Sequence, residues 1–204
     1  MIQLEITILI AVLTAIIGPL LVTKYRHYLK QKENVDPIAY TIKLNREIDN
    51  ELEILREELG CCRIWLSQFH NGGNFYPTGK SIQKFSTFYE HTGMGVVTIK
   101  EIFQNIPVSL FSKPFSELYE NNMLIIEDYK IGPTFGLGSI GNQLNNKSSY
   151  IFALKNLNGH FLGTLGIDLC KRKKVLDEET LIELENKSAA IGALLNSYLL
   201  QTNK

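Results

Sequence analysis

The chain begins with a long apolar segment. Ile6 to Thr23 are 18 consecutive residues without a charged side chain. As a helix rising about 1.5 Å per residue they would reach about 27 Å, close to the thickness of a bilayer core. Gly18 and Pro19 are tolerated in a membrane helix, where neighbouring groups satisfy the freed backbone. The pattern predicts a single transmembrane helix within an anchor of residues 1–32, with a buried helix of a soluble fold as the alternative.

The charges on either side of this segment predict its orientation. Glu5 precedes it, whereas Lys24, Arg26, Lys30 and Lys32 follow it. A cleaved signal peptide would carry its basic residues before the apolar run. Because basic flanks stay in the cytoplasm, we expect a plasma-membrane or inner-membrane protein with its amino terminus outside and the rest of the chain cytoplasmic.

Residues 33–60 contain a second periodic segment. After Pro37 the sequence is rich in strong helix formers and free of internal Gly and Pro. Apolar residues recur at alternating steps of three and four, which predicts a short parallel coiled coil and a homodimer. The alternative is a helix that packs on its own domain. The predicted dimer seam consists of Ile38, Thr41, Asn45, Ile48, Leu52, Leu55 and Leu59.

The last third of the chain predicts a β-hairpin followed by a helix. Ser148 to Cys170 are two apolar runs joined by Asn158-Gly159, a dipeptide typical of tight hairpin turns. Asp177 is a candidate N-cap for the helix that follows. The apolar face of that helix would be Leu181, Leu184, Ile191, Leu195 and Tyr198.

Together these elements predict an α+β fold, with a central antiparallel sheet flanked by N- and C-terminal helices. Residues 49–200 resemble a GAF domain, a small-molecule-binding and dimerisation module. "CRIWLSQFHNGG" is similar to the first strand of that family, and "SSYIFALKNLNGHFLGTLGID" with "DEETLIELENKSAAIGALLNSYL" to its paired strands and closing helix. The resemblance places the domain at residues 61–204. It implies a pocket on one sheet face, roofed by the middle segment, and dimerisation through terminal helices.

The chain departs from two branches of that family. It contains neither the N-K-F-D-E residues of cyclic-nucleotide-binding members nor a Cys-His pair like the one that attaches a bilin. The resemblance therefore supports neither ligand, and the identity of any cofactor stays unknown.

Two glycine-rich stretches resemble phosphate-binding loops without meeting all of their requirements. "NGGNFYPTGKS", Asn71 to Ser81, has Asn74 where a P-loop needs its first Gly, and a strand-like pattern follows it. "GLGSIG", Gly136 to Gly141, has no strand directly before it, which a dinucleotide site requires. We expect the first to connect two antiparallel strands and the second to lie over a pocket or core. A nucleotide hydrolase, with "MLIIED" as its second motif, remains an alternative.

The candidate ligand-binding residues come from the first strand, the aromatic residues and the glycine-rich segment. Phe69, His70 and Asn71 stand at the expected end of the first strand, and Ser139 lies within "GLGSIG". Aromatic side chains would line a pocket, although core packing is an equally available role for them. The aromatic set is Phe85, Phe88, Phe103, Phe111, Phe115 and Phe135.

Composition narrows the function further. The 21 basic and 21 acidic residues balance, which predicts no nucleic-acid partner. Cys61, Cys62 and Cys170 form no disulfide framework by spacing, so a reducing compartment is expected. No catalytic constellation or metal-ligand spacing stands out among the four histidines.

These observations predict a membrane-anchored sensory protein without catalytic activity, which binds an unknown small molecule and acts through an unknown protein partner. One alternative is a structural or assembly membrane protein, such as a virus-encoded one, that uses the fold only as a scaffold. A nucleotide hydrolase and a thiol redox enzyme using Cys61 or Cys62 are the others.

Overall fold

The structure is a computed structural model that describes residues 15, 17–32, 36–75, 77–171 and 175–202. The chain divides into two compact units, residues 1–42 and 43–204. Helix α2 (Gly18–Lys32) belongs to the first unit. Most of the predicted transmembrane segment Ile6–Thr23 lies outside the described residues. Among the helices that are described, none is both long enough and apolar enough to cross a bilayer.

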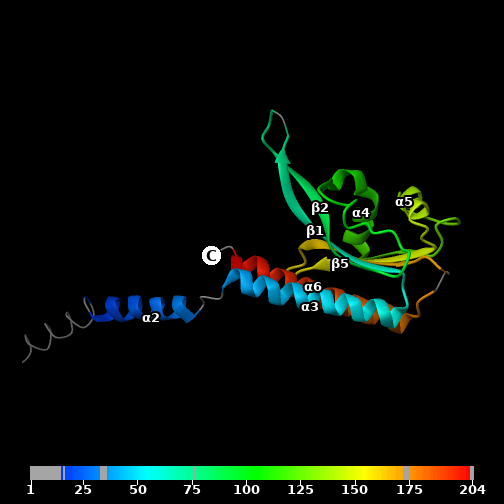
Figure 1. Cartoon of the computed structure of the whole chain (residues 1–204). Coiled ribbons are helices and arrows are strands. Elements are labelled where there is room, and N and C mark those ends of the chain that lie inside the picture. Colours follow the sequence, from blue (N-terminus) through cyan, green and yellow to red (C-terminus); the bar gives the residue numbers. More distant parts are fainter. Residues whose placement is uncertain (1–14, 16, 33–35, 76, 172–174, 203–204) are drawn as a thin grey trace, which may run out of the picture. The chain divides into compact units, whose positions relative to one another are not determined.

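The second unit is built on one six-stranded sheet in the order β3-β2-β1-β6-β5-β4 (Figure 1). Every neighbouring pair of strands is antiparallel. The strands are β1 (Arg63–Asn74), β2 (Ser81–Thr92), β3 (Ile106–Pro107), β4 (Met123–Ile126), β5 (Ser148–Lys155) and β6 (Phe161–Leu169).

Helices cover both faces of this sheet. From residue 43 onward, helix α3 (Pro37–Leu59) lies beside α6 (Glu178–Thr202) on one face, and α4 (Ser112–Asn121) and α5 (Gly138–Gln143) lie on the other (Figure 1). A short 3-10 helix, η2 (Val108–Phe111), precedes α4. The α+β class and the central antiparallel sheet with flanking helices are therefore confirmed.

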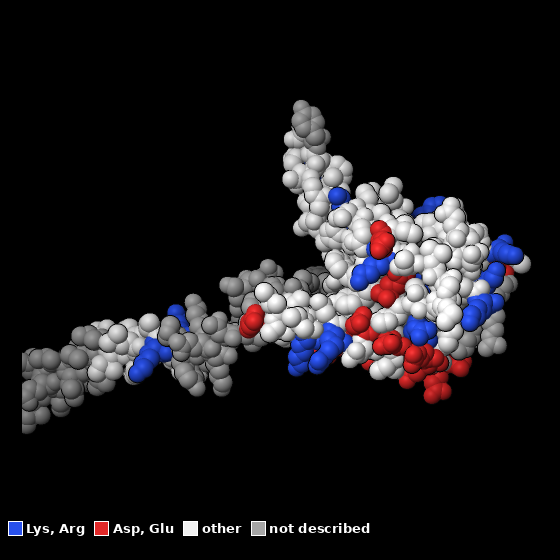
Figure 2. All heavy atoms as spheres, in the orientation of Figure 1, with Lys and Arg blue, Asp and Glu red and all other residues white. Residues whose placement is uncertain are grey.

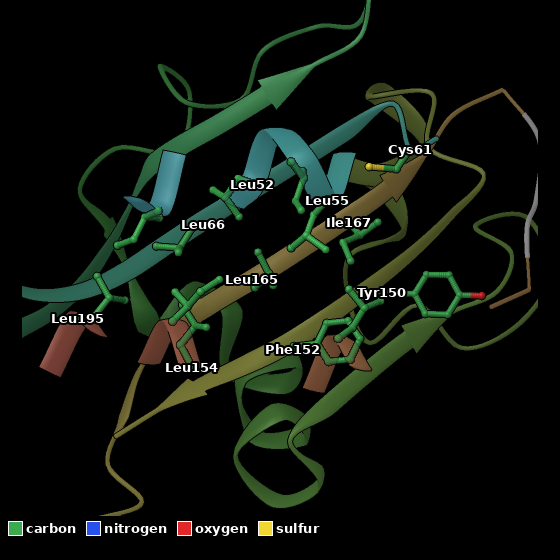
Figure 3. Close-up of a cluster of buried hydrophobic side chains, with 14 of the residues drawn as sticks. Leu52, Leu55, Cys61, Leu66, Tyr150, Phe152, Leu154, Leu165, Ile167 and Leu195 are labelled. Carbon is green, nitrogen blue, oxygen red and sulfur yellow. The ribbon is translucent and has the colours of Figure 1, made fainter. Parts of the chain in front are cut away.

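Alternation along the strands separates two sets of buried residues. One set points at α3 and α6 and forms the main core, in which side chains of both helices meet those of three strands (Figure 3). Full burial of each such aliphatic side chain contributes about 1.5–3 kcal/mol. The strand residues of this core include Ile64, Leu66, Tyr150, Phe152, Leu154, Leu165, Ile167 and Leu169.

Helix α3 uses much of its predicted dimer seam inside this core. Ile48, Leu52 and Leu55 are buried in the chain's own domain, and Leu59 packs against the same cluster. These side chains are therefore not available to a second copy, which corrects the predicted seam. The physical reason is that three-four spacing occurs in any helix with one apolar face, whatever covers that face.

The remaining seam positions are exposed or partly exposed. Ile38 is 70% exposed, and Asn45 accepts a hydrogen bond from the Tyr89 hydroxyl of its own domain. From residue 43 onward α3 belongs to the same compact unit as the sheet. Homodimerisation remains a prediction, but these seam residues do not support it.

The carboxy-terminal elements form as predicted. Strands β5 and β6 make an antiparallel hairpin, and Gly159 in its turn has a φ of 77°. A positive φ of this size favours glycine because a Cβ would be strained there. Asp177 caps α6 by accepting a hydrogen bond from the Thr180 backbone N-H at 2.8 Å.

The stretch "NGGNFYPTGKS" connects β1 to β2, as expected. Asn74 pairs with Ser81, and the Phe75 N-H donates to the Lys80 carbonyl at 2.8 Å. A strand follows Lys80 directly, so no helix N-terminus is present to bind a phosphate there. Strand β1 is longer than predicted, and it places His70 and Asn71 opposite β2 rather than in a turn.

The cysteines correct a prediction. Cys62 and Cys170 form a disulfide, although 108 residues separate them along the chain. Cys62 precedes β1 and Cys170 follows β6, and the register that pairs Arg63 with Asp168 brings the two cysteines together. Their spacing along the chain gave no sign of this, because the contact depends on strand order. Cys61 is buried in the main core.

Charged side chains gather unevenly although their sum is zero. On the face shown in Figure 2, Asp and Glu cluster near the lower edge of the domain, with Lys and Arg at separate places around them. One ion pair between a basic and an acidic side chain joins the two long helices. Lys187 on α6 donates to Glu51 on α3 at 2.7 Å, and this bond raises the pKa of Lys187.

Candidate functional site

A cavity of about 80 Å³ lies on the sheet face opposite α3 and α6. Its floor comes from the strands and its roof from η2, α4, α5 and the loops between them. The floor is Trp65, Ser67, Phe85, Thr87, Ile151, Thr164 and Asp168, and the rest is Ile99, Phe103, Phe111, Pro114, Phe115, Leu118, Tyr129, Leu137, Ile140, Gly141, Leu144 and Asn146.

Phenylalanine rings form one wall of the cavity. The Phe85 ring on β2 meets those of Phe111 and Phe115 edge-on, with centroids 5.2 Å apart in each pair. Phe103 lies 6.4 Å from Phe85 in a stacked arrangement. Such pairs add about 0.5–1.5 kcal/mol each beyond area burial, so they fix the roof helices on the sheet.

The other predicted aromatics lie elsewhere. Phe69 packs edge-on against Phe115 and Phe161, at 5.1 and 4.8 Å, without lining the cavity. Phe88 is 44% exposed. Phe135 packs in the smaller core cluster on this side of the sheet. Of the seven residues predicted to bind a ligand, only Phe85 therefore lines this cavity.

His70, Asn71 and Ser139 also lie outside the cavity lining. His70 Nε2 lies 2.9 Å from Ser86 Oγ, and Asn71 and Ser139 are exposed. The hairpin of β1 and β2 extends beyond the rest of the domain and carries His70 and Asn71 along it (Figure 1). Whether these residues touch a ligand stays a prediction.

Buried polar groups close one end of the cavity. The Asp168 carboxylate accepts hydrogen bonds from Arg63 Nη1 at 2.7 Å and from Ser149 Oγ at 2.5 Å. Ser149 in turn accepts from the Tyr129 hydroxyl at 3.0 Å. Asn146 accepts from Arg63 at 3.3 Å. These four side chains are thereby hydrogen-bonded to one another, as is usual for buried polar groups.

Arg63 also holds the loop that brings Ile99 to the cavity. Its Nε lies 3.2 Å from Glu90 Oε1, and its Nη2 donates to the Val97 carbonyl at 2.6 Å. Glu90 accepts from the backbone N-H groups of Ile99 and Lys100, at 2.8 Å each. One buried cation therefore joins three neighbouring strands to the wall of the cavity.

Tyr129 stays protonated in this setting. Burial, with a further contribution from the Asp168 charge, raises its pKa from 10.0 to about 12. Its ring lies against Gly141, where an added Cβ would come within 2.0 Å of a ring carbon. The last glycine of "GLGSIG" therefore allows close packing, and Leu137, Ile140 and Gly141 of that segment line the cavity as expected of a segment over a pocket.

Trp65 is the most unusual lining residue. Its indole Nε1 is buried and has no hydrogen-bond partner in the described part of the chain. The ring lies across Gly166 on the paired strand β6, where an added Cβ would sit 2.1 Å from two indole carbons. The sequence interpretation missed Trp65, Arg63, Tyr129 and Asp168. A Trp in β1 facing a Gly in β6 was the available signal, but it requires the register of the sheet.

The cavity has a lining that is mostly apolar. Its one carboxylate in the lining, Asp168, is occupied by Arg63 and Ser149. Among the described residues, no three His, Cys, Asp or Glu side chains gather as a metal would need. The volume is below the roughly 300–1,000 Å³ of pockets for drug-sized molecules, so the space suits a small ligand.

A second hollow, of about 650 Å³, surrounds the Cys62–Cys170 disulfide. Its lining includes charged surface side chains, among them Arg56, Glu57 and Lys171. Ligand sites are mostly apolar with a few converging polar groups. The smaller cavity fits that description better and is the candidate site.

Comparison with known proteins identifies the fold. No protein-family model and no curated protein matches the sequence. A far-red cyanobacteriochrome photoreceptor superimposes with a TM-score of 0.62 at 13% identity, covering 88% of this chain and 98% of its own. The GAF domain of PixJ from Thermosynechococcus elongatus, in its blue-light absorbing form, gives 0.61 at 14% identity over 81% and 92%.

A third similar structure is the GAF domain region of a putative membrane protein from Geobacter sulfurreducens. Its TM-score is 0.59 at 11% identity, covering 79% of this chain and 99% of that one. Identities this low show a shared fold. The domain therefore has a GAF-like fold, in agreement with the resemblance seen in the sequence.

Proposed function

We propose that this protein is a sensory module that binds a small molecule in the cavity beneath α4 and α5. The observation that carries the proposal is the cavity itself, which combines an aromatic wall with a compensated polar end. The structures of similar fold include photoreceptors that absorb far-red and blue light. A cavity of about 80 Å³ with no cysteine in its lining favours a smaller molecule, held without a covalent bond, over a bilin chromophore.

The proposed signal is a change in packing without catalysis. Strands β1, β5 and β6 carry cavity residues on one face and core residues against α3 and α6 on the other. A ligand that shifts these strands alters how residues 36–60 pack on the carboxy-terminal helix. A protein partner or a second copy of the chain would respond to that change by binding the exposed surface of the two helices.

The proposal keeps a single-pass anchor at Ile6–Thr23, in a plasma or inner membrane with the amino terminus outside. The basic residues from Lys24 to Lys32 support a cytoplasmic domain. The Cys62–Cys170 disulfide instead favours the opposite orientation, with the domain in an oxidising compartment, because cytosolic disulfides are usually transient. Protease protection in sealed membrane vesicles separates the two orientations: a domain protected in right-side-out vesicles supports the cytoplasmic one, and a digested domain overturns it.

Native mass spectrometry of the full chain in mild detergent tests ligand binding. We expect a reproducible extra small mass on the wild-type protein. The variant Ile140→Phe, which adds volume to the cavity lining, should lose that mass. The control Leu157→Phe, at a position 89% exposed, should keep it. A wild-type protein that never carries such a mass contradicts the proposal.

A second candidate function is that of a scaffold. The cavity that Phe85, Phe103, Phe111 and Phe115 help to line has a volume of only about 80 Å³. A protein that uses the fold for assembly alone needs no larger cavity. The scaffold function would be favoured if the protein carries no ligand. In that case its Ile140→Phe variant should gain stability without losing partner binding or assembly.

A further inference from the structure

The Cys62–Cys170 disulfide joins two strands that other contacts already hold together. Arg63, next to Cys62, is paired with Asp168 in the ladder between β1 and β6, and their side chains form an ion pair at 2.7 Å. The Cys62 backbone N-H donates to the Asp168 carbonyl at 3.0 Å. Opening the disulfide therefore does not by itself release these strands from their register.

The disulfide lies beside a hollow that opens to solvent. Both cysteines line this hollow of about 650 Å³. Cys62 is buried, at 6% exposure, whereas Cys170 is partly exposed. Thiol–disulfide exchange requires that an attacking thiolate reach one of the two sulfurs, and exposed disulfides exchange more readily than buried ones. A thiol that enters the hollow therefore meets Cys170 as the more accessible residue of the pair.

Each sulfur has an oxygen beside it that can accept a thiol proton. Cys62 Sγ lies 2.9 Å from the Asp168 carbonyl oxygen, and Cys170 Sγ lies 3.6 Å from Asn146 Oδ1. In the disulfide neither sulfur carries a proton, so neither contact is a hydrogen bond. Reduction gives each sulfur a weak S-H donor with an acceptor within reach. The surroundings therefore accommodate both the disulfide and the two thiols.

Asn146 connects the disulfide to the cavity. Its Oδ1 accepts from Arg63 Nη1 at 3.3 Å, and its side chain lines the cavity. A thiol proton on Cys170 would add a second donor to the oxygen that Arg63 already uses. Because Arg63 also binds Asp168, another lining residue, a change at Asn146 alters the polar end of the cavity.

We propose that Cys62 and Cys170 form a thiol–disulfide switch, opened by a low-molecular-weight thiol, whose state is transmitted to the cavity through Asn146. One thiolate attacks Cys170 Sγ, the S–S bond breaks, and Cys62 leaves as a thiolate that takes up a proton. A second molecule of the thiol attacks the mixed disulfide and releases Cys170 as a thiol. The two reductant molecules end as one disulfide, and two electrons and two protons have passed to the protein.

This inference goes beyond the proposed function and does not require a ligand in the cavity. A switch of this kind reconciles the disulfide with the cytoplasmic orientation, because disulfides in reducing compartments are usually transient or redox-sensing. A wild-type protein that carries no ligand in native mass spectrometry would contradict the proposed function and leave the switch standing.

A redox titration of the full chain in detergent micelles tests the switch. The protein is equilibrated in mixtures of reduced and oxidised glutathione, quenched with acid, alkylated and mapped without further reduction. We expect Cys170 to pass from the disulfide to the alkylated thiol within these mixtures, while near-ultraviolet circular dichroism shows a folded protein. A disulfide that resists every mixture and is reduced only after unfolding in urea overturns the inference, because such a bond is purely structural.

Two matched variants test which sulfur is reached from the hollow. Cys62→Ser keeps Cys170, Cys170→Ser keeps Cys62, and both lack the disulfide. With oxidised glutathione, we expect Cys170 to form the mixed disulfide about tenfold faster than Cys62, because it is the more exposed residue. Fragment masses distinguish Cys62 from its neighbour Cys61. Equal rates, or faster modification of Cys62, would overturn attack at Cys170.

The side-chain amide resonances of Asn146 test the link to the cavity. In ¹⁵N-¹H spectra they should shift when the disulfide is reduced, whereas those of Asn121, an exposed residue bonded to Glu117, should stay in place. The reduced wild type should also differ from Cys170→Ala at Asn146, because alanine supplies no donor. Asn146 resonances that ignore reduction overturn the transmission to the cavity, even where the disulfide itself is reducible.

Discussion

The guanidinium of Arg63 lies 2.7 Å from the carboxylate of Asp168 on the neighbouring strand, and both side chains are buried. Arg63 also lies 3.2 Å from Glu90 on the strand at its other side. This cation therefore joins β2, β1 and β6 beneath the cavity. It compensates two carboxylates that would otherwise be costly to bury.

Removal of Arg63 should strongly destabilise the protein. Arg63→Ala leaves Asp168 and Glu90 buried without their cation, which costs about 3–5 kcal/mol of unfolding free energy. Urea unfolding measures the loss. Lys43→Ala is the control, because its ion pair with Glu47 is exposed and should contribute under about 1 kcal/mol. Similar losses in both variants would contradict the structural role of Arg63.

The close approach of Trp65 to Gly166 predicts a second effect. Gly166→Ala places a Cβ against the indole ring and should cost about 1–3 kcal/mol of unfolding free energy by overpacking. The emission maximum of the single tryptophan should shift as its ring moves. Gly93→Ala is the control, since its Cβ would meet the nearest atom at an ordinary 3.6 Å. An unshifted emission maximum in Gly166→Ala would show that the indole lies elsewhere.

Tyr129 predicts a loss of stability at alkaline pH. Its pKa rises from 10.0 to about 12 on folding, so between these values the folded state binds more protons than the unfolded state. The free energy of unfolding is unaffected by this group below about pH 10 and falls as pH rises toward 12, by about 2–3 kcal/mol in total.

Urea unfolding at several pH values from 9 to 12 measures this fall. Tyr129→Phe should flatten it, although Tyr150, whose pKa burial also raises, keeps part of the slope. Tyr119→Phe, an exposed control, should behave as wild type. An equal slope in wild type and Tyr129→Phe would contradict the prediction.

The disulfide predicts a covalent link that peptide mapping detects. Digestion without reductant should give a cross-linked pair of peptides containing Cys62 and Cys170. Cys170→Ser should remove the link and cost about 2–5 kcal/mol, because the bond closes a loop of about a hundred residues in the unfolded chain. Cys61→Ser should keep the link. If wild-type protein from the native compartment lacks the cross-linked peptides, the thiols of Cys62 and Cys170 stay reduced there.

Leu52 distinguishes a core helix from a dimer seam. Leu52→Ala should cost about 2–5 kcal/mol of unfolding free energy, since this side chain is fully buried within its own domain. Its effect should be independent of protein concentration in urea unfolding. Ile38→Ala, at an exposed position, should cost little. A strong concentration dependence in the wild type that Leu52→Ala abolishes would restore the dimer seam.

Local patterns predicted a large part of the fold. The Asn158-Gly159 turn, the Asp177 cap and the strand-like pattern after Lys80 depend on neighbours in the chain, and the structure confirms each of them. Local backbone preference and side-chain alternation are properties of short segments, so the sequence alone determined these elements and their antiparallel pairing.

Which face meets which partner was decided only by the tertiary structure. The spacing of Ile48, Leu52 and Leu55 showed an apolar stripe but not that α6 and the sheet cover it. The Cys62–Cys170 bond, the Arg63–Asp168 pair and the Trp65–Gly166 contact each join residues about a hundred positions apart. These contacts follow from strand order and register, which are set by the combined packing of all six strands and the helices upon them. No short segment carries that information, and so the cavity became visible only in the folded chain.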